Sequence, residues 1–141
     1  MAMLITRCVA LLGLVSLTAC QSPEPIETAS DLANALQSKG MQFDSLDAID
    51  LSGMGFAQVD EGVRVTGNGL RVEILRVEDE RTFKLVSSLG SLLKALNERF
   101  DDAPVNPPDV IARHPFVVVV RQESEPGEVR RIVERLLPQE S

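Results

Sequence analysis

The chain has 141 residues, which is the size of one ordinary domain. Hydrophobic residues make up 44% and charged residues 25% of it, a balance typical of a globular protein rather than of a disordered one. The net charge of -7 disfavours nucleic acid as a partner, because binding to phosphate groups requires a basic face. Trp and Tyr are absent, which also disfavours sugar-binding and base-stacking surfaces.

The first 19 residues have the pattern of a secretory signal. Arg7 is their only charged side chain, and a largely apolar run from Cys8 to Leu17 follows it. This run is shorter than the ~20 residues that a membrane-spanning helix needs. We therefore expect residues 1–19 to be a cleavable signal peptide, with a buried helix as the alternative interpretation of the same run.

The four residues Leu17-Thr18-Ala19-Cys20 resemble the lipobox of bacterial lipoproteins. The resemblance implies that the Cys20 thiol receives a diacylglyceryl group, that a peptidase cuts before Cys20, and that the new amine is acylated. Several acyl chains, such as palmitate, on one residue would anchor the protein to a membrane. By the sorting rule of enterobacterial lipoproteins, Gln21 favours the periplasmic face of the outer membrane, with the inner membrane as the alternative. Cys8 would leave with the signal peptide, so the mature domain would contain no disulfide.

After the lipid anchor, residues 20–28 are predicted to form a short tether that two prolines keep extended, and residues 29–141 a single domain. A first helix is predicted from about 29 to 39, capped by Thr28 or Ser30 and ended by Gly40. An extended segment follows it. Alternating apolar residues on both sides of Gly67-Asn68-Gly69 then predict a β-hairpin, because these three residues supply the positive φ angles of a tight turn.

The second half of the chain contains two helical patterns around a β-branched run. Apolar residues recur every three or four positions from Phe83 to Phe100, which predicts a long helix from about 79 to 99. A strand over Thr82–Val86 with a helix from Ser87 is the alternative. Residues 101–109 are rich in proline and predicted as a loop, and residues 115–120 as a buried strand. A last helix is predicted after them, capped by Ser124 or Glu125, with Pro126 in its first turn and Pro138 as its end.

The order is therefore α-β-β-β-α-β-α, which predicts an α+β fold. We expect a small antiparallel or mixed sheet with the helices packed on one face. The layout is loosely similar to that of small uncharacterised bacterial lipoproteins, and this similarity carries no functional motif with it.

Each group of residues that could carry chemistry also has a simpler structural interpretation. His114 is the only histidine, and neither a metal site nor a nucleophilic triad can be built around it without further partners. The acidic residues between the first helix and the hairpin are spaced like a solvated edge rather than a calcium loop, and the glycines lack the context of a phosphate loop. These residues are Asp44, Asp47, Asp50 and Asp60, and Gly53, Gly55, Gly62, Gly67 and Gly69.

The last helix carries a basic cluster. Arg130, Arg131 and Arg135 lie on it, with Arg121 nearby in the sequence, and they could face anionic lipid or an acidic partner. Glu128 and Glu134 on the same helix favour intrahelical pairing instead.

These observations predict no catalytic residue, no metal and no cofactor, and Cys20 as the only modified site. We expect a non-catalytic protein-interaction module of the cell envelope, held on the membrane by its lipid and binding another envelope protein. An inhibitor of an envelope hydrolase, with the hairpin tip as its inserted loop, is a variant of this hypothesis. A domain that binds a small ligand or a lipid between its sheet and its long helix is the alternative.

Overall fold

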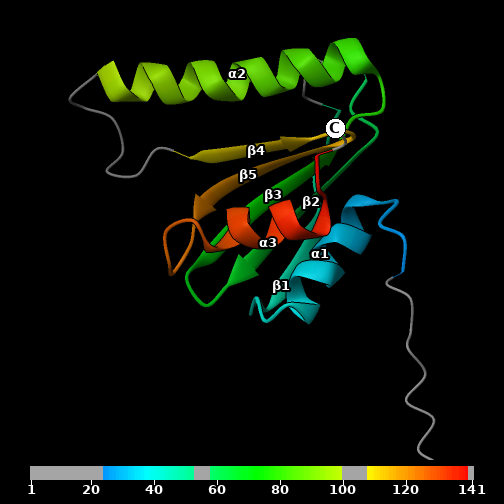
Figure 1. Cartoon of the computed structure of the whole chain (residues 1–141), viewed down its shortest axis with the longest axis vertical. Helices are drawn as coiled ribbons and strands as arrows, with labels where there is room; N and C mark the ends of the chain where they lie inside the picture. Colours follow the sequence, from blue (N-terminus) through cyan, green and yellow to red (C-terminus); the bar gives the residue numbers. More distant parts are fainter. Residues whose placement is uncertain (1–23, 53–57, 100–107, 140–141) are drawn as a thin grey trace, which may run out of the picture.

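An antiparallel sheet with three helices around it forms the part of the chain that the computed structural model describes, residues 24–52, 58–99 and 108–139 (Figure 1). The strands lie in the order β1-β2-β3-β5-β4, and each is antiparallel to its neighbours. The elements in chain order are α1 (Ala29–Ser38), β1 (Ser45–Ala48), β2 (Glu61–Gly67), β3 (Leu70–Arg76), α2 (Glu80–Arg99), β4 (Asp109–Arg113), β5 (Phe116–Gln122) and α3 (Glu128–Leu136).

The hairpin between β2 and β3 forms at the predicted residues. Gly67 pairs with Leu70, so Asn68 and Gly69 make a two-residue connection with φ angles of 52° and 76°. Positive φ at both central residues matches the right-handed twist of the strands, which explains the Asn-Gly pair at this place. Gly67 itself has φ 137°, and a Cβ atom there would lie 2.4 Å from the backbone nitrogen of Asp44.

The two faces of the sheet bury different apolar clusters. Side chains alternate between the faces along each strand, so Ile74 and Val118 lie on one face and Leu75 and Val117 on the other. The first face packs against α1 and α3 and holds the larger core, including the fully buried side chains of Phe116, Leu32, Leu36, Ile74 and Ile111. Burying one such side chain stabilises the fold by roughly 1.5–3 kcal/mol.

The start of α1 is held to the sheet as well as capped locally. The Asp31 N–H donates to the Thr28 hydroxyl at 3.0 Å, and the Thr28 N–H donates to the Asp31 carboxylate at 2.9 Å, which completes a capping box. Glu61 of β2 accepts the Ala29 N–H at 3.0 Å. Of the two residues predicted as the cap, Thr28 is therefore the one that caps the helix. The helix ends before Gly40, whose φ is 99°.

The predicted α+β class and order of elements are confirmed, and so is a single helix over residues 80–99 instead of a strand over Thr82–Val86. The structure adds β4, which begins at the end of the predicted loop over residues 101–109. The three apolar residues Val110–Ala112 follow a proline-rich run, and a strand that short produces little alternation.

The prediction that the helices share one face holds for α1 and α3 and is wrong for α2. Phe83 and Val86 of α2 pack on the second face, around Leu75, Val77 and Val117. The physical reason is visible in β5, where four consecutive valines follow Phe116. A strand that is apolar at every position must be covered on both faces.

Candidate functional site

Helices α1 and α3 border an open groove with an apolar floor. The floor consists of five side chains that are only partly buried: Ile26, Ala35, Ile132, Leu136 and Leu137. Four of these, all except Ala35, also pack against the main core, so the groove is the outward continuation of that core. Its volume is about 860 Å³. Apolar surface in a concave place with a polar rim is typical of a binding site.

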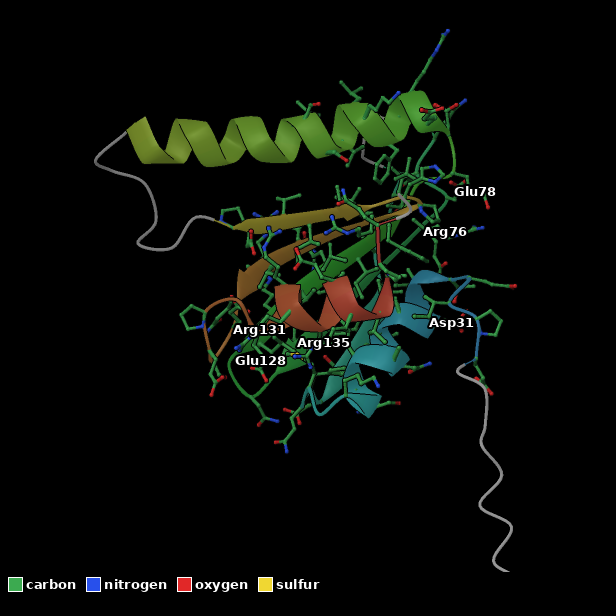
Figure 2. The ribbon with its side chains drawn as sticks, in the orientation of Figure 1. Asp31, Arg76, Glu78, Glu128, Arg131 and Arg135 are labelled. Carbon is green, nitrogen blue, oxygen red and sulfur yellow. The ribbon has the colours of Figure 1, made fainter. Side chains whose placement is uncertain are left out.

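The rim of the groove carries charges of both signs. Glu24 and Asp31 lie toward the tether and the start of α1, whereas Lys39 follows the last turn of α1 and Arg135 comes from α3. Figure 2 shows Asp31 on α1, and Arg135 together with Arg131 on the lower side of α3. Hydrogen bonds from the Thr28 backbone and side chain, and from the Glu27 backbone, hold the pKa of Asp31 below its usual value, so its charge already serves the helix cap.

Lys39 and Arg135 differ from Asp31 because their charges are not used inside the fold. Both side chains are exposed, and neither forms an ion pair with another of the described residues. Arg131, one turn earlier on α3, is 3.7 Å from Glu125, with 61% and 72% of the two side chains exposed. An exposed pair at that distance contributes little. The α3 side of the groove therefore presents positive charge to solvent.

Glu123, the residue after β5, caps α3 and so positions one wall of the groove. Its carboxylate accepts the Gly127 N–H at 2.7 Å and the Val129 N–H at 3.2 Å. The prediction that Ser124 or Glu125 caps this helix is therefore wrong, and α3 begins at Glu128, two residues after Pro126. The Ser124 hydroxyl instead donates to the Asn68 carbonyl at the hairpin tip.

Arg130 fixes the other side of α3 to the sheet. Its guanidinium donates to both carboxylate oxygens of Asp109 on β4, at 3.0 and 2.6 Å, and to the Val110 carbonyl at 3.0 Å. The hydrogen bond to Asp109 is the main cause of a raised pKa of Arg130. The predicted basic cluster is thus divided. Arg130 has a structural role, Arg135 and Arg131 face solvent, and Arg121 lies on the second face of the sheet, 3.4 Å from Glu73.

The other candidate residues from the sequence make contacts within the fold. His114 Nε2 donates to the Glu78 carbonyl at 3.0 Å, and its ring meets the edge of Phe83 with 5.0 Å between the centroids. Asp50 accepts the Ser52 N–H and hydroxyl, and Asp60 accepts the Glu78 N–H. Within residues 24–52, 58–99 and 108–139, no three side chains of His, Cys, Asp or Glu come together as metal ligands would.

Cys20, Gly53 and Gly55 lie outside the described residues. None of the helices in the described part is both long and apolar enough to cross a membrane. Comparisons with protein-family models, with curated proteins and with solved structures give no match.

The groove itself was not identified from the sequence. The spacing of Ile132 and Leu136 in the sequence is that of a buried helix face, and no motif marks Lys39. One signal was available. Ala35 is a small residue on the solvent side of an otherwise polar α1 surface, and a small residue leaves room for a neighbour. Which helix would lie beside it depends on tertiary packing, which a one-residue signal does not specify.

Proposed function

We propose that this protein is a lipid-anchored interaction module of the bacterial cell envelope. In this proposal the lipid on Cys20 holds it on the periplasmic face of the outer membrane, and the groove between α1 and α3 binds a segment of another envelope protein. That segment carries apolar side chains next to carboxylates. The observation that carries the proposal is a partly exposed apolar floor beside two cations that have no ion-pair partner in the described part of the chain.

The floor and the rim of the groove indicate which side chains the bound segment carries. Ile132, Leu136 and Leu137 offer aliphatic surface, which favours aliphatic or aromatic side chains and excludes a uniformly polar peptide. Lys39 and Arg135 lie on the rim, where a charge mainly sets the rate of association and the choice of partner. Because both are positive, an acidic segment associates faster than a basic one.

The groove is tested by site-specific photocrosslinking in cells. A photoreactive phenylalanine replaces Asn34, an exposed residue that lines the groove, and Gln37 on the same helix is the matched control because it is exposed and lies outside the groove. We expect an adduct from position 34 and not from position 37. Mass spectrometry of the adduct should identify a peptide with apolar residues and Asp or Glu side by side.

A charge reversal then tests whether the positive charge on the rim attracts the partner. Arg135→Glu should lower the yield at position 34 at least about fivefold, because a repulsive rim charge acts on the encounter rate. Equal yields at positions 34 and 37, or a yield that Arg135→Glu leaves unchanged, would overturn the groove proposal. An adduct that contains lipid and no peptide would instead indicate that this groove binds lipid.

The anchor is tested separately. Metabolic labelling with an alkyne analogue of palmitate should label the wild-type protein and not the Cys20→Ser variant, and mass spectrometry should find a mature N-terminus at an acylated Cys20. An unmodified Cys20, or a cleavage site elsewhere, would refute the anchor without affecting the groove. Fractionation of the labelled cells distinguishes the outer from the inner membrane.

A further inference from the structure

Strand β1 is an edge of the sheet, and half of its backbone groups point away from β2. The Ile49 N–H donates to the Gly62 carbonyl at 2.8 Å, in register with the pairs Asp47–Arg64 and Ser45–Thr66. Backbone groups alternate in direction along an antiparallel strand, so Leu46 and Ala48 direct their N–H and C=O groups outward. Within the described residues, no strand pairs with this outer side.

The opposite edge of the sheet, strand β4, is protected, unlike the edge at β1. Helix α2 packs against β4, and Arg130 of α3 donates to the Val110 carbonyl. Natural sheets usually cover, shorten or charge their edges because a bare edge pairs with other chains. Of these three kinds of protection, the described residues show only shortness and charge on β1. It has four residues, Asp47 is exposed, and the Leu46 side chain remains 38% exposed.

The geometry points to a second interaction surface: the outer edge of β1 pairs with an extended segment that carries Lys or Arg at alternate positions. Adding a strand to an open edge uses the outward backbone groups for affinity and the flanking side chains for specificity. Asp47 within β1 is exposed, and it is the acidic side chain that a row of basic residues on one face of the added strand would meet. Asp44 and Asp50 are also exposed; they lie just outside β1, three positions from Asp47 and so not on its face, and they add negative charge around the edge. Opposite charges across a strand pair are favourable.

A second copy of this chain is a worse occupant than a basic segment. The antiparallel register that uses the outward groups of both Leu46 and Ala48 in each copy places Asp47 directly opposite Asp47. Like charges in directly opposite positions are destabilising. The same acidic edge therefore disfavours self-association and selects a basic strand. This surface is independent of the groove, because no residue of β1 lines it.

The test is binding of a fluorescein-labelled peptide of alternating Lys and Val to the mature protein in detergent, measured by anisotropy. A peptide with Glu in place of Lys is the first control. We expect the Lys peptide to bind at least about tenfold more tightly than the Glu peptide, with an affinity that falls as salt is added. Hydrogen exchange should become slower in β1 when the Lys peptide is bound.

Two variants separate edge pairing from general attraction to an acidic protein. Ala48→Pro removes an outward N–H while leaving the ladder between β1 and β2 intact, and should weaken binding about fivefold, as expected for one hydrogen bond. Asp47→Lys should reverse the preference between the two peptides. Glu80→Lys makes the same charge change on α2, outside this edge, and should leave the preference unchanged.

Several results would overturn the inference. They are equal binding of the Lys and Glu peptides, equal effects of Asp47→Lys and Glu80→Lys, and an absence of slowed exchange in β1. If circular dichroism shows that Ala48→Pro unfolds, Asp47→Lys and the exchange measurement decide alone. A shift of the protein to a dimer on concentration, abolished by Asp47→Lys, would identify a second copy as the occupant and refute the basic segment.

Discussion

The carboxylate of Glu123 is expected to determine the stability of α3. It accepts N–H groups from Gly127 and Val129 at 2.7 and 3.2 Å, and the cap residue Gly127 offers no side chain of its own. Glu123→Ala leaves both donors at the start of a helix without a protein partner. Loss of a cap costs about 0.5–2 kcal/mol, and this one supplies two bonds from a charged group. We therefore expect Glu123→Ala to lower the free energy of unfolding by about 1.5–2 kcal/mol.

The assay is urea unfolding of the mature protein followed by far-UV circular dichroism. The midpoint should fall with an unchanged slope, because the surface exposed on unfolding stays the same. Ser124→Ala and Glu125→Ala are the matched controls, and each should change stability by less than about 0.5 kcal/mol. A Glu123→Ala variant within about 0.3 kcal/mol of the wild type, or a larger loss in either control, would refute the assignment of the cap.

Three further predictions follow from the fold. Gly67→Ala should destabilise the protein by at least about 1–3 kcal/mol, because φ is 137° and the new Cβ would meet the Asp44 nitrogen; urea midpoints measure this. Ile74→Ala, at a fully buried position, should cost about 2–5 kcal/mol and Ile74→Val far less, measured the same way, and equal losses would contradict the packing. A hydrogen bond from the Thr82 N–H lowers the pKa of Asp79 in the folded protein. The Asp79 carboxylate therefore contributes fully to stability above its pKa in the unfolded chain, about 3.9, and this contribution disappears as the pH falls through its lower pKa in the folded protein. The stability difference between wild type and Asp79→Asn should accordingly shrink on acidification below about pH 4, and a difference that grows would contradict it.

The elements that were predicted correctly are those with local causes. Thr28 and Asp31 are three residues apart and complete their capping box within one turn of α1. Asn68 and Gly69 have the conformational freedom that a two-residue connection requires. Neither feature needs information from elsewhere in the chain, so a single sequence is sufficient to place them.

The features that sequence reasoning missed depend on distant residues. Glu61 helps to hold the start of α1 from 32 positions away, and nothing in its own neighbourhood marks it as a capping residue. At α3 the two predicted caps, Ser124 and Glu125, directly follow the observed one, Glu123, and all three residues are polar. The choice among them depends on the direction in which the chain leaves β5, which local propensity does not encode. The groove is a similar case, because it is created only when α3 lies beside α1.

The charge of the domain bears on how it would present the groove at a membrane. The proposed cleavage before Cys20 would take away Arg7 and leave 13 basic against 21 acidic side chains, a net charge of -8. An anionic lipid surface repels such a domain, so the tether rather than a flat protein–lipid contact would set its position. The seven residues 21–27 span at most about 25 Å. The groove begins at Glu24, within that span. Under the proposed anchoring, a domain repelled by the surface but held this close to it would keep the groove open to solvent and within reach of a segment that projects from the same membrane.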